Sequence, residues 1–136
     1  MSKRTFNIIS GSAALIFGGI LYILFRQDTS ISMYFKRVAW IKSLIDPASQ
    51  MDCILLKYYL QDFLWALSLG CFLNAVIDSN RRIDCAGGII ALLCGCFWEI
   101  MQSVKIARGT GDILDIAMYF VAGVVCSLIN IKEREE

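Results

Sequence analysis

The sequence predicts an all-α integral membrane protein with four transmembrane helices arranged in a bundle. Apolar residues make up 57% of the 136-residue chain, and its mean hydropathy is +0.62. Charged residues make up only 18%, whereas soluble domains carry about 25%, so there are too few charges to cover a water-exposed surface. The apolar residues gather into four long runs. The length suits one domain, and we assign residues 1–136 to a single membrane domain.

The first predicted transmembrane helix covers residues 6–25. This run contains no charge and is bracketed by Arg4 and Arg26. At a rise of about 1.5 Å per residue it extends for about 30 Å, which matches the hydrocarbon core of a bilayer.

The other three predicted transmembrane helices cover residues 58–77, 85–104 and 112–131. Acidic residues interrupt them near one end: Asp62 in the second helix, Glu99 in the third and Asp115 in the fourth. A charge at the bilayer centre costs at least about 2.5–3.5 kcal/mol, so we expect these side chains to face the bundle rather than lipid. The connections between these helices are short, so neighbouring helices should be antiparallel.

The first connection, residues 27–59, admits two interpretations. Residues 31–42 mix aromatic and basic side chains, as an amphipathic helix lying in the membrane interface does. The same residues could instead form a loop that rests on the lipid headgroups. Pro47 is expected to end this segment.

Composition excludes several classes of function. The chain has no histidine, so it lacks the commonest general base and the usual zinc ligand. Its net charge of +1 does not indicate nucleic-acid binding. We expect no metal site and no cofactor. The six cysteines lie mostly in apolar runs without a C-x-x-C pair, and we interpret them as small packing residues: Cys53, Cys71, Cys85, Cys94, Cys96 and Cys126.

Several polar residues should meet at one face of the membrane. Four alternating spans place the start of the second helix, the end of the third and the start of the fourth on the same side. Small residues recur every four positions before Glu99, at Gly87, Ala91 and Gly95, and such stripes let membrane helices approach closely. The residues gathered by this connectivity are Asp62, Glu99, Gln102, Arg108, Asp112 and Asp115.

These groups support more than one chemistry. A pair of carboxyl groups can serve as general acid and base, and Arg108 could hold an anion through a bidentate contact. The alternative is a purely structural role, in which Asp112 caps a helix and Arg108 pairs with Glu99. The sequence leaves an integral-membrane enzyme, a small transporter and a non-catalytic ligand-binding protein as alternatives.

The same residues resemble the VanZ-like family of small bacterial membrane proteins. The carboxyl-terminal motif reads WEIMQ at residues 98–102 and RGTGDILD at residues 108–115, followed by Tyr119 and Gly123. An earlier element, YLQDFLWALSL at residues 59–69, is similar to the family's Pro-Asp-x-x-Trp helix start. Gln61 stands where proline is usual, and Tyr119 stands where Asn is frequent. The resemblance covers roughly residues 46–126.

The resemblance implies a role in the cell envelope, since the founding member is an accessory factor in resistance to the glycopeptide teicoplanin. It also implies a shared polar site, and it adds Tyr119 to the candidate residues. We expect this site to bind a polar headgroup or a cell-wall ligand. Besides this ligand, the lipid bilayer is the expected partner. The sequence is also compatible with a homo-oligomer.

Charge suggests how the chain is oriented. Lys and Arg are divided almost equally between the two sides of the membrane, but the pairs at residues 3–4 and 81–82 flank the side of the termini. By the positive-inside rule, we expect a multi-pass protein of the cytoplasmic membrane with both termini in the cytoplasm.

Overall fold

The computed structural model describes residues 2–26, 30–49, 53–77, 86–107 and 111–135. Every element in these ranges is a helix, so the prediction of an all-helical chain is confirmed. In chain order the helices are α1 (Lys3–Phe25), α2 (Ser30–Phe35), α3 (Ala39–Ser49), the π-helix η1 (Leu55–Tyr59), α4 (Leu60–Val76), α5 (Ala86–Ser103) and α6 (Ile113–Glu135).

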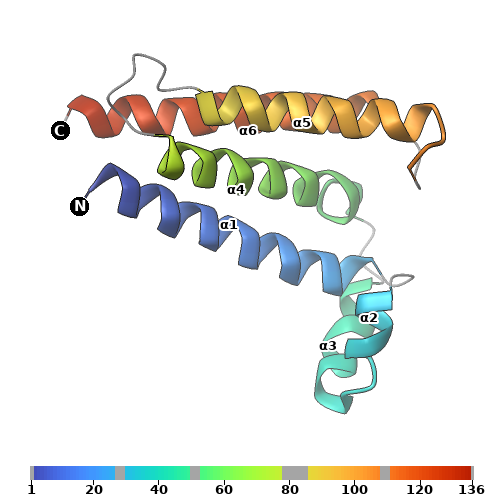
Figure 1. Cartoon of the computed structure of the whole chain (residues 1–136). Coiled ribbons are helices and arrows are strands. Elements are labelled where there is room, and N and C mark those ends of the chain that lie inside the picture. Colours follow the sequence, from blue (N-terminus) through green and yellow to red (C-terminus); the bar gives the residue numbers. More distant parts are fainter. Residues whose placement is uncertain (1, 27–29, 50–52, 78–85, 108–110, 136) are drawn as a thin grey trace.

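The long helices α1, α4, α5 and α6 lie side by side and alternate in direction, so both termini are at the same end (Figure 1). Helix α4 is central, because α1 packs on one side of it and both α5 and α6 pack on the other. Helix α1 therefore meets the α5–α6 pair chiefly through α4.

Two helices are long and apolar enough to cross a membrane, judged by length and composition: α1 and α5. Helix α4 and the segment Ile113–Ile129 of α6 are apolar but shorter. Helix α4 has 17 residues, about 25 Å at the rise of an α-helix.

The ends of the helices differ by a few residues from the predicted ones. Helix α1 begins at Lys3 because the Ser2 hydroxyl caps it, accepting a hydrogen bond from the Thr5 N–H at 3.2 Å. Helix α6 continues past residue 131 to Glu135. The tail contains Lys, Glu and Arg, which are good helix formers, so charge ends the apolar run without ending the helix.

The first connection is helical, in two pieces that meet α1 near its carboxyl end (Figure 1). Helix α2 ends at Phe35 and α3 begins at Ala39, so the break falls within residues 31–42, where a single helix was one of the two interpretations. The expectation that Pro47 ends the segment is wrong, because α3 continues to Ser49. Proline loses one backbone hydrogen bond, but its fixed φ is itself helical.

Small residues let α5 approach its neighbours closely. Gly87, Gly88 and Ala91 are buried, and a side chain at Gly87 would overlap the carbonyl oxygen of Gly70 on α4. A side chain at Gly95 would overlap the Tyr119 ring on α6. The stripe predicted from the sequence therefore lies on the packed side of α5.

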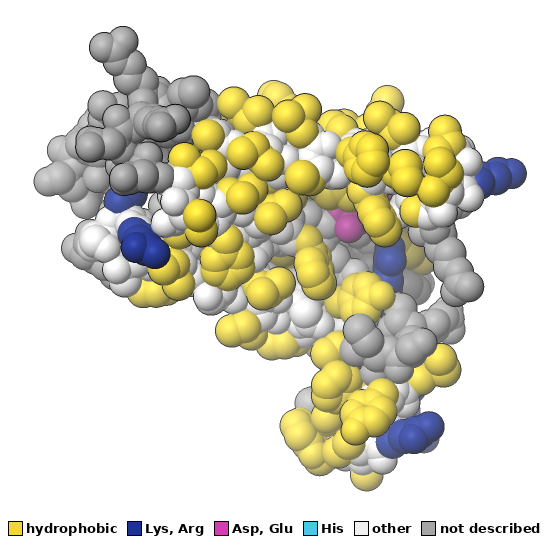
Figure 2. Space-filling view, in the orientation of Figure 1, with side chains coloured by type: hydrophobic (Ala, Val, Ile, Leu, Met, Phe, Trp, Pro, Cys, Tyr) yellow, Lys and Arg dark blue, Asp and Glu magenta, His cyan; other side chains and the backbone are white. Residues whose placement is uncertain are grey.

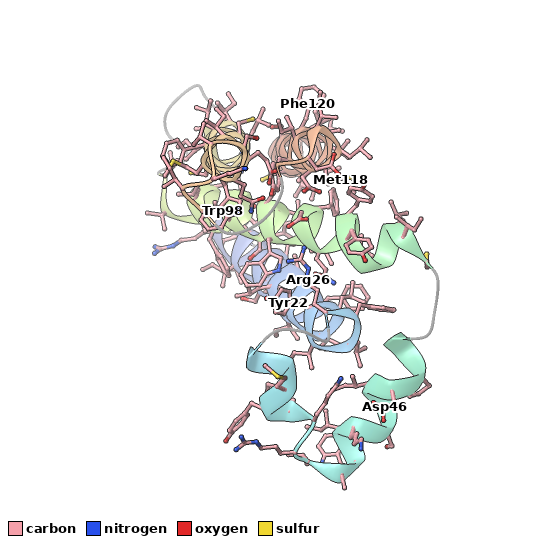
Figure 3. The ribbon with its side chains drawn as sticks, turned by 90° about the vertical axis from the view of Figure 1, so that its right-hand side faces the viewer. Tyr22, Arg26, Asp46, Trp98, Met118 and Phe120 are labelled. Atoms are coloured by element: carbon pink, nitrogen blue, oxygen red, sulfur yellow. The ribbon has the colours of Figure 1, made fainter. Side chains whose placement is uncertain are left out.

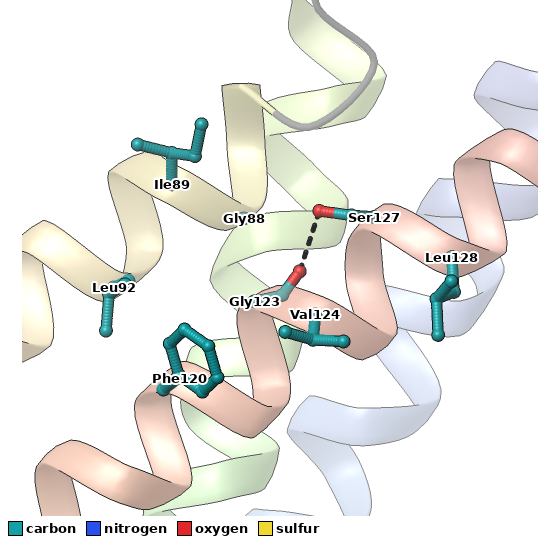
Figure 4. Close-up of a pocket in the computed structure, with 8 residues that line it drawn as sticks. All are labelled: Gly88, Ile89, Leu92, Phe120, Gly123, Val124, Ser127 and Leu128. Atoms are coloured by element: carbon teal, nitrogen blue, oxygen red, sulfur yellow. Dashed lines mark hydrogen bonds between the residues drawn. The ribbon is translucent and has the colours of Figure 1, made fainter.

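The backbones of α5 and α6 approach each other closely at Gly88 and Gly123 (Figure 4). Beside this contact a shallow apolar groove of about 210 Å³ opens on the outside of the pair. The groove is lined by Gly88, Ile89, Leu92, Phe120, Gly123, Val124, Ser127 and Leu128.

The turn after α5 carries local backbone strain. Lys105 has a φ of 59°, in the left-handed region that costs residues other than glycine roughly 1–2 kcal/mol. The Lys105 N–H donates to the Gln102 carbonyl at 2.9 Å, and the Ile106 N–H donates to the Met101 carbonyl at 2.9 Å. These bonds form a Schellman motif, whose left-handed position is usually glycine.

Replacing Lys105 by glycine should therefore stabilise the protein by about 0.5–1 kcal/mol, because relief of the strain exceeds the added entropy of the unfolded chain. Thermal unfolding in detergent micelles would measure the change. Lys105→Ala is the control, since it removes the charged side chain and keeps the strain. An equal gain from both variants would contradict a backbone origin.

Candidate functional site

A polar cavity of about 430 Å³ lies at the end of the helical array where α1 ends and α4 begins. Each of the long helices and η1 contributes to its wall. The lining residues are Tyr22 and Arg26 of α1 and its cap, Tyr58 and Tyr59 of η1, Asp62 of α4, Trp98, Glu99 and Gln102 of α5, and Asp112, Asp115 and Tyr119 at the start of α6.

The structure brings together every predicted site residue that it describes. These residues are Asp62, Glu99, Gln102, Asp112, Asp115 and Tyr119. The seventh, Arg108, lies outside the described residues. They meet for the reason found in the sequence: alternating helix directions bring the start of α4, the end of α5 and the start of α6 to one end.

Sequence reasoning missed the contribution of α1. Tyr22 and Arg26 lie one helical turn apart, and the Arg26 guanidinium carbon is 5.8 Å from the centre of the Tyr22 ring. In the view along the helices, Tyr22, Arg26 and Trp98 lie between α1 and α5 (Figure 3). The sequence did contain a signal for this contribution: Tyr22 lies four residues before Arg26, the arginine that follows the first apolar run.

Glu99 connects α5 to the beginning of α6. It is only 3% exposed, and both carboxylate oxygens accept hydrogen bonds. The Tyr119 hydroxyl donates to Oε1 at 3.1 Å, and the Asp112 N–H donates to Oε2 at 3.0 Å. A buried charge requires such partners, so these bonds account for an acidic residue in the middle of the packed surface.

Asp112 caps α6. Its Oδ1 accepts from the Leu114 N–H at 3.0 Å, and its Oδ2 accepts from the Tyr59 hydroxyl at 3.2 Å. A carboxylate at a helix amino terminus satisfies backbone donors and interacts favourably with the helix dipole. The helix-capping role considered for Asp112 from the sequence is therefore present, and Tyr59 links the cap to η1.

Asp62 and Asp115 form an acidic pair across the boundary between α4 and α6. Their carboxyl groups are close enough to interact electrostatically with each other. The Arg26 guanidinium interacts electrostatically with both. The acidic pair and Arg26 therefore form one polar cluster of the cavity, and Glu99 and Asp112 with their hydrogen-bond partners form a second.

The π-helix η1 forms the wall between α1 and α6. It runs directly into α4 and presents Tyr58 and Tyr59 to the cavity. π-Helical turns are rare in proteins overall, but those that do occur are often found at functional sites. Its presence here was not predicted, because residues 58–59 read in the sequence as the start of an ordinary helix.

The cavity combines negative charge with aromatic surface. Among the described lining residues, four carboxyl groups face one guanidinium and five aromatic rings. Within the described part of the chain, no three Cys, Asp or Glu side chains are grouped as a metal site would require. The cysteines that the structure describes form no disulfide with one another: Cys53, Cys71, Cys94, Cys96 and Cys126.

The cavity is open to the side of the helical array. Figure 2 shows an acidic and a basic side chain between the upper helices and α1, within a face that is otherwise mainly hydrophobic. Trp98 and Tyr58, which line the cavity, are 52% and 45% exposed, so they stand at its edge.

Comparison of the chain with protein-family models, curated proteins and solved structures gives no match.

Proposed function

We propose that this chain is a multi-pass membrane protein in which α1, α4, α5 and α6 each cross the bilayer. The exposure of the apolar helices supports this proposal. Only 28% of the most apolar window of α1, and 22% of that of α5, is buried, whereas a core helix of a soluble protein would be mostly buried. Large side chains such as Ile16 and Phe97 are more than half exposed, and such extensive apolar surface needs a partner.

The length of α4 fits this proposal once η1 is included. Residues 55–76 are continuously helical, and 22 residues are sufficient to cross a hydrocarbon core of about 30 Å. The polar cavity then lies near one membrane face, on the side opposite the two termini. The membrane is the cytoplasmic membrane, and the termini are in the cytoplasm.

In this arrangement the cavity binds a polar headgroup or a cell-wall ligand at the membrane face. The observation that carries the proposal is a 430 Å³ polar cavity within an apolar exterior, built by all the long helices. Ligand pockets have volumes of about 300–1,000 Å³. Holding helices together requires far fewer polar groups than line this space.

The resemblance to the VanZ-like family supports a role in the cell envelope, and specifically in tolerance of the glycopeptide teicoplanin. Several residues of the motif line the cavity, among them Asp62, Glu99, Gln102, Asp112, Asp115 and Tyr119. If the family's activity depends on this site, then altering the cavity should abolish it.

Expression of the wild-type chain in a susceptible Gram-positive host should raise the teicoplanin concentration needed to stop growth. Asp115→Asn should abolish the increase, because it removes a charge from the cavity without changing the size of the side chain. Asp46→Asn is the matched control, since Asp46 lies exposed on α3 away from the cavity (Figure 3). Membrane abundance of each variant is measured in parallel. A wild type without effect, or an Asp115→Asn variant that keeps the activity, would contradict the proposal.

The Asp62–Asp115 pair favours a second candidate function, an enzyme acting on a lipid-linked substrate. Two carboxyl groups that face each other can supply a general acid and a general base. In that case either Asp62→Asn or Asp115→Asn alone should abolish activity while ligand binding persists. A transporter built on the same pair would instead lose activity when the proton gradient is dissipated.

A further inference from the structure

We propose that the cavity binds the headgroup of a phospholipid that carries an ammonium group, with the ammonium beside Asp62 and Asp115 and the phosphate beside Arg26. This inference rests on the proposed function and names its ligand. Four independent features of the cavity lead to it: the distribution of charge, the aromatic lining, the place of Arg26 and the lateral opening.

The distribution of charge favours a cationic group. Four carboxyl groups and one guanidinium line the cavity. Glu99 and Asp112 accept hydrogen bonds from Tyr119, Tyr59 and two backbone N–H groups, so their oxygens already hold α5, α6 and η1 together. Among the described residues, no tyrosine hydroxyl or backbone N–H donates a hydrogen bond to Asp62 or Asp115. An added positive charge would therefore have its most favourable electrostatic interaction beside these two carboxyl groups.

The aromatic lining distinguishes an organic ammonium from a small metal ion. Tyr22, Tyr58 and Trp98 stand around the same space as the acidic pair. The face of an aromatic ring attracts an ammonium group by about 0.5–2 kcal/mol, depending on solvent exposure. A cavity of about 430 Å³ is also far larger than an ion needs, since a single water occupies about 30 Å³ of liquid.

Arg26 is placed to take the anionic part of the same ligand. It caps the carboxyl end of α1, its side chain is exposed, and its guanidinium lies over Tyr22. Guanidinium groups bind phosphate through two parallel hydrogen bonds. A cation at the edge and acidic groups further in match a headgroup whose phosphate and ammonium are separated by a short chain.

The lateral opening favours a lipid over a water-soluble ligand. An acidic and a basic side chain are visible from the side, between helices whose outer surfaces are hydrophobic (Figure 2). Trp98 and Tyr58 at the edge have both apolar and polar parts, as residues at the membrane interface do. A phospholipid could therefore place its headgroup in the cavity while its acyl chains stay in the bilayer.

Fluorescence of Trp98 can test this inference in the full-length protein. The chain has three tryptophans, and Trp40→Phe with Trp65→Phe leaves Trp98 alone as the probe. The protein is reconstituted in phosphatidylglycerol nanodiscs, and phosphatidylethanolamine is added in increasing proportion. Two parallel series use phosphatidylethanolamine with an acetylated amine, which keeps the phosphate and removes the cation, and free phosphoethanolamine in solution.

We expect a saturable change in Trp98 emission with phosphatidylethanolamine and none with its acetylated form. The double variant Asp62→Asn, Asp115→Asn should weaken this binding at least about tenfold, as expected for removal of one side of a buried charge pair. Asp46→Asn should leave binding unchanged. Circular dichroism verifies the fold of each variant, and if the double variant does not fold, the comparison of native with acetylated lipid in the wild type still decides.

The outcomes separate this inference from the proposed function. Equal saturable binding of native and acetylated lipid would overturn the ammonium assignment and leave a headgroup-binding cavity. A response to free phosphoethanolamine but not to the lipid would keep the chemistry and overturn the lipid as its source. No change in Trp98 emission in any series would overturn the inference, and the teicoplanin test would then decide the proposed function separately.

Discussion

Gly88→Ala should destabilise the protein by at least about 2 kcal/mol, within the range measured for overpacked cores. A Cβ atom at this position would lie 2.6 Å from the carbonyl oxygen of Gly123 on α6. The obstacle is helix backbone rather than a flexible side chain, so α5 and α6 would have to move apart (Figure 4). That movement would also loosen the Glu99–Asp112 connection at the far end of the same two helices.

Gly19→Ala is the matched control for this prediction. A Cβ at Gly19, in the interior of α1, would meet nothing within 4 Å. Alanine is favoured over glycine in a helix by roughly 0.5–1 kcal/mol, so this variant should be as stable as the wild type or slightly more stable. Chemical or thermal unfolding in the same detergent measures both. Similar stability of the Gly88 and Gly19 variants would show that α5 and α6 are not in close backbone contact.

Glu99→Leu should cost about 3 kcal/mol, the second large effect. The substitution leaves two donors without an acceptor, the Tyr119 hydroxyl and the Asp112 N–H. Each unsatisfied buried donor costs about 1–3 kcal/mol. Glu99→Gln should be milder, since the amide keeps one acceptor oxygen and loses the other.

A double-mutant cycle with Tyr119→Phe assigns this cost to the hydrogen bonds. Tyr119→Phe alone should cost about 1 kcal/mol, the typical net value of one hydrogen bond. In the Glu99→Leu background it should cost much less, because the hydroxyl already lacks its acceptor. If the two substitutions prove additive, the Tyr119–Glu99 hydrogen bond makes no contribution to stability.

The helices could be predicted because their signals are local. An uncharged run of suitable length marks α1, and the small residues at Gly87, Ala91 and Gly95 mark the packed side of α5. The local signal is weaker where several outcomes have similar energy. Pro47 reads as a helix end, yet its backbone angle permits α3 to continue to Ser49, and the π-helical turn at Tyr58 and Tyr59 has no periodic signature.

The sequence also predicted that the candidate site residues lie close together. Once the helices alternate in direction, the start of α4, the end of α5 and the start of α6 must share one end. This argument needs only the order of the helices along the chain. It therefore placed Asp62, Glu99 and Asp115 together without any knowledge of which helix packs against which.

What the sequence alone determined is thus the set of helices and the end at which its acidic residues gather, because hydropathy and connectivity act along the chain. The tertiary structure decided the lateral order of the helices, with α4 central and α1 apart from the α5–α6 pair. That order opens the cavity and brings Arg26 to it. It also gives the acidic residues different roles, because Glu99 connects α5 to α6 while Asp62 and Asp115 face each other. Such choices depend on side chains from distant segments meeting across a helix boundary, and no pattern within one segment encodes them.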